Sequence, residues 1–200
     1  MSIAWWQAVL IALGYYLSQA PWIPGAFFTI YRPLIAGTLV GLILGDPLQG
    51  MMIGATINLV YLGFISAGGS LPTDPALAGW VGTALGLAAG LDANQTLALA
   101  VPLGLVGTLA FLLRMTGDSY FVHRADAAAQ EGSIRGLILN HIAYAQLFLF
   151  IITFVPAYLA VALGAQPVSH AMSALPAWVM GGLGVVGGLL PAIGIGIILV

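Results

Sequence analysis

The amino-acid sequence predicts an all-α protein that crosses a membrane several times and contains broken and re-entrant helices. Of its 200 residues, 61% are hydrophobic and 5% are charged. A soluble domain carries roughly 25% charged residues. One core of this size cannot bury so much apolar surface, so the surplus requires lipid. The apolar residues also fall in runs separated by Pro, Gly or polar residues, and several runs are too short to span a bilayer alone.

The runs follow one another from the amino terminus. Residues 3–17 form the first, and no basic residue precedes Arg32, so this run is interpreted as a mature helix and not as a secretory signal. Residues 34–45 cover only about half a bilayer at ~1.5 Å per residue. Asp46-Pro47 interrupts this apolar stretch, which then continues to residue 66. Further helices are predicted at 76–91, 96–113, 136–163 and 174–200.

Residues 114–135 form the only extended polar segment and are predicted to be a cytoplasmic loop. The stretch around Arg124 is either a short solvated helix or a docking surface for a soluble partner, and charge alone does not decide between them. The segment holds three of the four arginines of the chain, and positive charge is retained on the cytoplasmic side of membranes. The sequence is expected to form one membrane-embedded domain over residues 1–200. Its last run has no polar flank, so we expect the whole protein to extend beyond it.

The sequence contains a weak internal similarity. Residues 37–45 (GTLVGLILG) resemble residues 82–90 (GTALGLAAG), and each copy is followed by an Asp and, three residues later, a Gln. Either this is a true repeat, as in many transporters, or Gly-rich helices are similar by chance. The interrupted helices themselves favour transport, because non-helical backbone at membrane depth is tolerated where it is buried in protein or lines a watery cavity.

Several function classes find no support in the residues. The chain has no cysteine and no lysine, and its three histidines are scattered. It therefore has no P-loop and no recognisable metal site, and we expect no cofactor. Four arginines do not make a nucleic-acid-binding face. No nucleophile motif is present, so no catalytic residues and no enzymatic activity are expected.

The polar residues at the Gly/Pro-rich segment 68–75 are candidates for a solute site. Gly68 and Gly69 free the backbone, Ser70 supplies a hydroxyl and Asp74 supplies a carboxylate, which accepts strong hydrogen bonds from sugar hydroxyls. Alternatively, Asp74 caps a helix that starts at a proline in a solvated loop. The spacing favours the cap, and both roles are compatible if one carboxylate oxygen stays free.

Two further polar residues lie in apolar surroundings. Asn58 is the only amide within residues 51–65. It suits a polyhydroxylated solute, although a hydrogen bond between helices is the simpler interpretation. Gln19 and Arg32 flank a Pro-rich turn, where an interfacial, snorkelling arginine is the default. Asp46 either pairs with Arg32 or marks a helix break, and the break is favoured.

Three stretches carry a resemblance to a known family. Residues 32–47 (RPLIAGTLVGLILGDP), 49–63 (QGMMIGATINLVYLG) and 68–76 (GGSLPTDPA) resemble the IIC subunit of the mannose/fructose/sorbose family of bacterial sugar phosphotransferase systems. The resemblance implies a non-catalytic, multi-pass permease of the cytoplasmic membrane. Such a permease moves an external hexose or amino sugar inward by an elevator-like shift. The pattern is most similar to the N-acetylgalactosamine/galactosamine and sorbose branches.

The resemblance also implies partners and a binding site. The partners are a IID membrane subunit, in a trimer of IIC–IID pairs, and soluble IIA and IIB subunits, of which IIB phosphorylates the sugar. Asp74 and the Gly68–Ser70 turn match the sugar-site loop of the family, and Asn58 falls where relatives often have Gln or Glu. The predicted substrate-binding residues are Gln19, Asn58, Gly68, Gly69, Ser70 and Asp74.

One alternative function stays open at this point. The substrate-binding membrane component of an ATP-driven vitamin or micronutrient importer is also a small, apolar, multi-pass chain. Neighbouring genes would separate the two, because a phosphotransferase subunit is expected beside IIA, IIB and IID genes and the alternative beside a pair of ATPases.

Overall fold

The computed structural model describes residues 2–62 and 73–199, without the side chains of residues 27 and 197–199, and every regular element in these ranges is helical. A 3-10 turn, η1 (Ala26–Phe28), follows α1, and two π-helical segments, η3 (Ala78–Gly82) and η4 (Leu139–Tyr144), precede α5 and α8. The predicted all-α class is confirmed. The α-helices are α1 (Trp5–Gln19), α2 (Pro33–Leu44), α3 (Pro47–Val60), α4 (Pro75–Leu77), α5 (Thr83–Ala89), α6 (Ala93–Gln130), α7 (Ile134–Ile138), α8 (Ala145–Ala174) and α9 (Ala177–Leu199).

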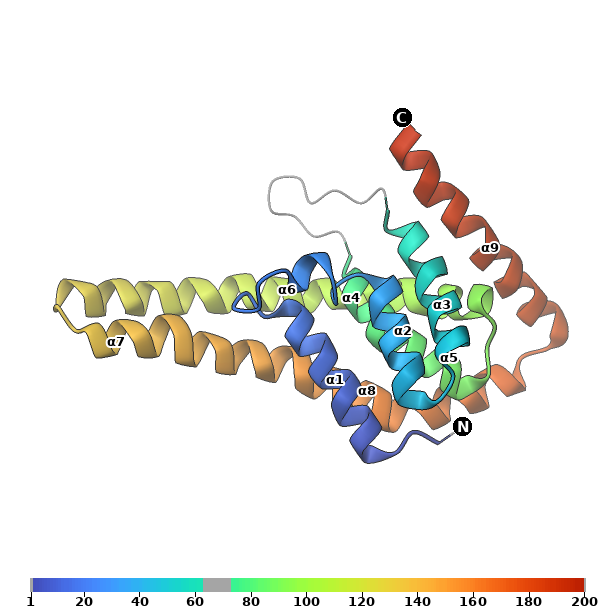
Figure 1. Ribbon diagram of the computed structural model, residues 1–200, viewed down its shortest axis with the longest axis horizontal. Helices are drawn as coiled ribbons and strands as arrows, with labels where there is room; N and C mark the ends of the chain where they lie inside the picture. The colour runs from blue at the N-terminus through green and yellow to red at the C-terminus, as the bar shows by residue number, and fades with distance from the viewer. Residues whose placement is uncertain (1, 63–72, 200) are drawn as a thin grey trace.

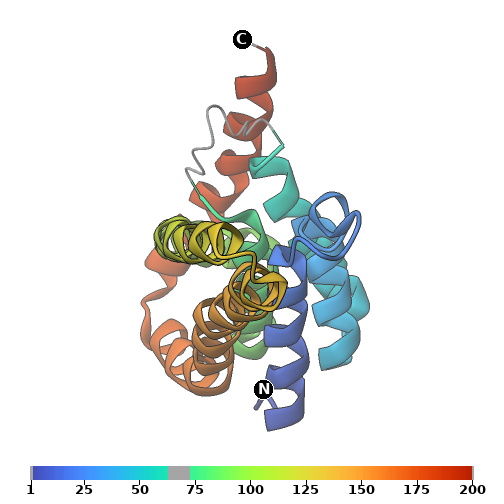
Figure 2. The ribbon, with the colours of Figure 1, turned by 90° about the vertical axis from the view of Figure 1, so that its left-hand side faces the viewer.

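The helices form a body and a projecting arm. Figure 1 shows that α1 to α5 lie together with the first half of α6 and the later part of α8, while the second half of α6, α7, η4 and the start of α8 extend beyond them as the arm. Seen along the arm in Figure 2, α1 stands beside α8, in agreement with their direct packing. The helix α9 turns away after α8 and packs against α6 and α3.

The repeated sequence corresponds to two helical hairpins. In the first, α2 turns into α3 at Gly45, and the Asp46 side chain caps α3 by accepting from the backbone N–H three residues on. In the second, α5 turns into α6 at Gly90, and Asp92 caps α6 in the same way. Both glycines have positive φ, 90° and 70°, which a side chain disfavours. The repeat is therefore structural, and Asp46 marks a helix break and not a partner of Arg32.

The two hairpins differ in how closely their helices approach. In the first, a Cβ on any glycine of the interface would collide with the backbone of the facing helix. In the second, a glycine at the end of η3 and one in α5 face the larger Ala100 and Thr96 of α6. The tips of the hairpins meet where Gln49 Nε2 donates to the Leu91 carbonyl at 3.4 Å. The interface glycines of the first hairpin are Gly37, Gly41, Gly50 and Gly54, and those of the second are Gly82 and Gly86.

The larger of two apolar clusters among the described residues connects most helices of the body. It joins Ile11 and Tyr15 of α1, Val40 of α2, Trp80 of η3 and Val161 of α8, all almost fully buried. The Trp80 indole N–H also donates to the Ile30 carbonyl at 3.0 Å. Helices distant in sequence are thereby fixed around the end of α1, which is where the polar side chains described below gather.

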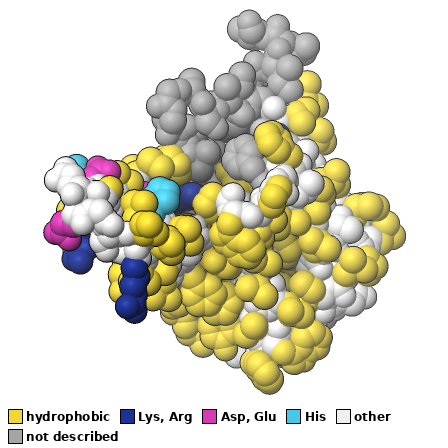
Figure 3. Space-filling view, turned by 60° about the vertical axis from the view of Figure 1, so that its left-hand side comes forward, with side chains coloured by type: hydrophobic (Ala, Val, Ile, Leu, Met, Phe, Trp, Pro, Cys, Tyr) yellow, Lys and Arg dark blue, Asp and Glu magenta, His cyan; other side chains and the backbone are white. Residues whose placement is uncertain are grey.

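Within the part of the chain that the structure describes, three helical stretches are long and apolar enough to cross a bilayer: Ala93–Gln130, Ile134–Ala174 and Ala177–Gly196. Two shorter apolar stretches, Pro33–Leu44 and Pro75–Ala89, accompany them. Figure 3 shows hydrophobic side chains over most of the visible surface and charged ones gathered at one end. A surface of this kind requires lipid or protein around it. The chain is therefore a multi-pass membrane protein with short, interrupted helices, as predicted.

The polar segment 114–135 differs from the predicted loop. The helix α6 continues to Gln130, and only a short turn around Gly132 separates it from α7. The reason is local, because residues 124–130 (RADAAAQ) are rich in alanine, the strongest helix former. Backbone hydrogen bonds of a helix form in water as well as in lipid, so the loss of apolar residues did not end α6.

Candidate functional site

Asp74 directly precedes α4 and is almost completely buried, with 2% of its surface exposed. Its Oδ1 accepts from the backbone N–H groups of Ala76 and Leu77 at 2.9 and 3.2 Å. Pro75, which has no N–H, occupies the first helical position. The Asp74 N–H donates to the Gly104 carbonyl at 2.8 Å. The predicted helix cap is confirmed.

The second carboxylate oxygen of Asp74 is also occupied. Its Oδ2 accepts from the Tyr15 hydroxyl at 2.6 Å and from Gln19 Nε2 at 2.9 Å. These residues are four apart on α1, so they share one face of that helix. The expectation of a spare oxygen for a solute is wrong, because a buried carboxylate needs all its acceptor sites filled. Asp74 therefore positions Tyr15 and Gln19.

Two glycines of α6 let the Asp74 segment approach this closely. A Cβ at Gly107 would lie 2.5 Å from the Asp74 Cβ. A Cβ at Gly104 would lie 2.5 Å from the Tyr61 hydroxyl and 2.7 Å from the Thr73 Oγ1. Atoms do not approach to such distances, so the middle of α6 must lack side chains at these positions.

Arg114 of α6 extends the polar group beyond Asp74. Its Nη1 donates to the Gln19 backbone carbonyl at 3.2 Å, and its Nε lies 3.5 Å from Asp118 Oδ2. Gln19 ends α1 and leaves its carbonyl without an intrahelical partner. The guanidinium thus satisfies a helix end and fixes the Gln19 backbone, whereas Asp74 fixes the Gln19 side chain.

Two hollows of different size meet at these residues. The one directly at Asp74 is about 20 Å³, enough for one water molecule. The other is about 370 Å³, lies at the end of α1, and is lined by Gln19, Arg114, Tyr31 and Phe111 among others. The larger hollow has room for a ligand, whereas the smaller one is more than tenfold below it in volume. Only the second hollow can hold a small organic solute, and Gln19 and Arg114 line both.

Gln19 presents a free acceptor in this arrangement. With Nε2 bonded to Asp74, the amide orientation is set, and its Oε1 makes no hydrogen bond with another described residue. Tyr31 and Phe111 add aromatic surface to the same hollow. An amide oxygen, a guanidinium and aromatic rings can together bind a solute that has hydroxyl groups on an apolar ring.

The predicted site residues are only partly brought together. Gln19 and Asp74 meet, although 55 residues separate them. Asn58 lies half-buried on α3, and no described residue forms a hydrogen bond with its side chain. Gly68, Gly69 and Ser70 lie outside the described residues. Within the described ranges, no group of three His, Cys, Asp or Glu side chains could hold a metal ion.

Sequence reasoning missed Tyr15, Tyr31, Phe111 and Arg114. Tyr15 carried a usable signal, because it lies one helical turn before Gln19. The sequence predicts Arg114 in a polar loop, and nothing in its neighbourhood indicates a contact with α1. The aromatic residues were indistinguishable from other apolar residues of the runs.

The family is shown by comparison with known proteins. The family model described as the sorbose-specific IIC component of the phosphotransferase system matches residues 5–200. The chain is 32% identical over 167 residues to the mannose-specific EIIC component of Escherichia coli K12, covering 84% of this chain and 63% of that one. It is 33% identical over 199 residues to the N-acetylgalactosamine permease IIC component 1 of the same strain, covering 95% and 70%.

A solved structure agrees with the sequence comparisons. The mannose transporter ManYZ in complex with microcin E492 contains a chain that is 30% identical, with a TM-score of 0.72 and coverage of 100% of this chain and 80% of that one. The chain spans 63% of the length of the mannose-specific relative. With its broken hairpins, apolar spans and matched sequence, it belongs to the sorbose-type family of IIC components of the sugar phosphotransferase system.

Proposed function

We propose that this chain is the membrane subunit through which a bacterial phosphotransferase complex takes up an external hexose or amino sugar. The observation that carries the proposal is the Gln19 amide, fixed by Asp74 at the wall of a 370 Å³ hollow inside a body of broken helices. The named relatives are components for mannose, sorbose, N-acetylgalactosamine and fructose. All of these are compact, hydroxylated solutes.

The binding role is divided between contact and positioning. Gln19 Oε1 accepts a hydrogen bond from a sugar hydroxyl, and the Arg114 guanidinium donates one. Tyr31 and Phe111 cover the apolar face of the ring. Asp74 sets the direction of the Gln19 amide without touching the sugar. Asn58 and the turn at Gly68–Ser70 stay predictions from sequence, and the described contacts support Gln19 and Asp74 instead.

The proposed transport cycle requires partners and motion. The arm exposes apolar side chains of α6 and α8 along its length, such as Leu113 and Leu147, and these suit lipid and a IID membrane subunit. A trimer of IIC–IID pairs and soluble IIA and IIB subunits complete the complex, and IIB phosphorylates the sugar at the cytoplasmic face. The body moves against the arm in an elevator-like shift. The relatives give no support to an ATP-driven vitamin importer.

Uptake measurements test this function. The chain is produced with its IID, IIA and IIB subunits in cells that lack other permeases for these sugars. Uptake of radiolabelled mannose, sorbose, N-acetylgalactosamine and fructose is then compared. Gln19→Ala is expected to reduce uptake of the preferred sugar at least tenfold at equal membrane content. Gln166→Ala, the same change at an exposed amide of α8, is the control and is expected to match the wild type.

A clear result contradicts the proposal. If none of the four sugars accumulates with the complete set of subunits, the chain does not perform this function. If a sugar accumulates equally in wild type and in Gln19→Ala, the transport function stands and the site assigned to it does not.

A further inference from the structure

We propose a second sugar-binding site, located where the arm joins the body on the far side of Arg114 from Asp74. It occupies a cavity of about 200 Å³ between α6, η4, α8 and the turn after α1. This inference rests on the proposed function, because the ligand is the transported sugar. The first site lies at the end of α1, whereas this one is built mainly by residues of the arm.

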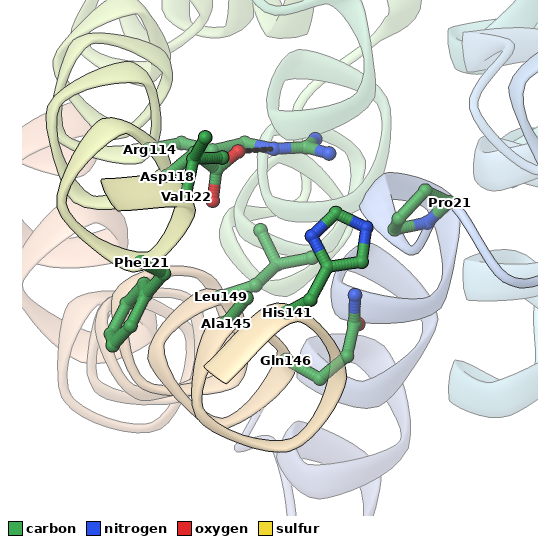
Figure 4. A pocket seen from close by; sticks show the side chains of 9 residues that line it. All are labelled: Pro21, Arg114, Asp118, Phe121, Val122, His141, Ala145, Gln146 and Leu149. Atoms are coloured by element: carbon green, nitrogen blue, oxygen red, sulfur yellow. Dashed lines mark ion pairs between the residues drawn. The ribbon is translucent and has the colours of Figure 1, made fainter. Parts of the chain in front are cut away.

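Figure 4 shows how the polar side chains meet in this cavity. Arg114 and Asp118 reach in from α6 and form the ion pair, with Nε and Oδ2 3.5 Å apart. His141 of η4 faces them, Gln146 of α8 lies beside His141, and Pro21 closes the opposite side. Four side chains with hydrogen-bonding capacity thus converge from three elements.

Gln146 is the group that points most directly to a ligand. Its Oε1 is buried and has no hydrogen-bond partner among the described residues. A buried acceptor without a donor is costly, and most such atoms in folded proteins are satisfied. The other orphan atom of this kind in the described ranges is Thr83 Oγ1 in α5, which lines none of the hollows described above. A bound solute would therefore supply the hydroxyl or N–H donor that Gln146 Oε1 lacks.

The backbone around His141 supports the same assignment independently. Residues Leu139–Tyr144 form a π-helical segment inside the arm, and π-bulges are frequent at functional sites because they redirect side chains. Asn140 holds this segment by donating to the Gly136 carbonyl at 2.8 Å and accepting from Arg124 Nε at 3.2 Å. The other π-helical segment, η3, follows the Asp74 cap of the first site.

Charge decides the class of ligand. The Arg114 guanidinium and the Asp118 carboxylate neutralise each other, so the cavity carries no excess positive charge for a phosphate. An ion pair, an amide and an imidazole supply both donors and acceptors, which matches the alternating needs of sugar hydroxyls. Phe121 lines the cavity as well and offers an apolar face. The site therefore fits the unphosphorylated sugar better than its phosphorylated product.

The two sites are connected through shared residues. Arg114 lines this cavity, the small hollow at Asp74 and the larger hollow at Gln19. Leu149 lines this cavity and the hollow at Asp74, and Pro21 lines this cavity and the larger one. A sugar released by Gln19 can therefore pass to Gln146 while Arg114 holds it. The second site is an intermediate binding site between the body and the polar end of the arm.

Equilibrium binding on the IIC–IID complex in lipid nanodiscs tests the proposal. The probe is the radiolabelled sugar that gives the highest uptake in the four-sugar comparison. Gln146→Leu is expected to bind one equivalent of sugar fewer per IIC chain than the wild type at saturation. Gln130→Leu, the same change at an exposed position of the arm, is expected to bind as many equivalents as the wild type.

Thermal unfolding of the same samples separates binding from folding. Removing an unpartnered buried oxygen is expected to leave the midpoint of Gln146→Leu equal to or above that of the wild type. Equal binding by Gln146→Leu and wild type overturns the second site. Gln19→Ala is measured in parallel and is expected to bind the other equivalent about tenfold more weakly. If Gln19→Ala binds as the wild type while Gln146→Leu loses one equivalent, the first site fails and the second stands.

Discussion

Replacing Asp74 by alanine removes the acceptor of four hydrogen bonds at once. Two of these cap α4, and the others come from Tyr15 and Gln19. Loss of a cap costs about 1 kcal/mol, and each buried donor left unpaired costs about 1–3 kcal/mol. Tyr15 is 2% exposed and bears the full penalty, whereas half-buried Gln19 can turn toward water in the hollow.

We therefore expect Asp74→Ala to lower the free energy of unfolding by about 2–4 kcal/mol. For a chain of this size, that corresponds to a fall in the unfolding midpoint on the order of 10 °C. The assay is thermal unfolding of the IIC–IID complex in detergent, followed by tryptophan fluorescence, because buried Trp80 packs in the cluster that includes Tyr15. Uptake is expected to fall as well, because Gln19 loses its orientation.

Asp74→Asn is the matched variant in this experiment. It keeps an acceptor for the cap, and the Tyr15 hydroxyl and the Gln19 amide can both rotate to accept from the new NH₂ group. Stability is expected to fall by no more than about 1–2 kcal/mol. The flipped amide, however, presents Nε2 to the hollow and weakens sugar binding. An Asp74→Ala complex with wild-type stability would refute the assignment of Asp74 as the residue that positions Tyr15 and Gln19.

Three further predictions concern packing and charge. Gly37→Ala is expected to destabilise the first hairpin strongly, because its Cβ would lie 2.6 Å from the Gly50 carbonyl oxygen. Gly45 has open space around it but a φ of 90°, so Gly45→Ala is expected to cost only about 1 kcal/mol. Thermal unfolding of the two variants in parallel checks both expectations. Gly107→Ala is expected to reduce uptake by displacing Asp74, and wild-type uptake in this variant would contradict the close approach. Arg114→Lys keeps the charge but cannot reach the Gln19 carbonyl and Asp118 together, so uptake is expected to fall several-fold. Unchanged uptake would contradict a role for Arg114 in both proposed sites.

The hairpins were largely predictable from the sequence, and for physical reasons that are local. Glycine followed by an Asp that caps the next helix acts within a few residues, so Asp46 and Asp92 could be read from the repeat. The cap at Asp74 is local in the same way. The low hydropathy after residue 113 predicts the end of a helix, whereas α6 continues to Gln130 because the alanines near Arg124 favour helix.

The contacts of the candidate site were harder to predict from the sequence. Asp74 lies 59 residues from Tyr15 and 55 from Gln19, and their meeting depends on how α1 packs against the second hairpin. No local pattern encodes such a distance. Gln19 was nevertheless predicted, because a polar side chain next to a helix break is conspicuous in an apolar chain. Arg114 was not, because its position at the start of a polar segment suggested solvent.

The central claim is that Gln19, held by Asp74, contacts the sugar, and the affinity of the Gln19→Ala complex tests it most directly. The dissociation constant for the preferred sugar is measured on the IIC–IID complex in nanodiscs. The unfolding midpoints of variant and wild type are measured as well, to show that both complexes are equally stable. Loss of a hydrogen bond to the sugar is expected to weaken binding about tenfold, which corresponds to about 1.4 kcal/mol. A Gln19→Ala complex that binds the sugar as tightly as the wild type would contradict the account.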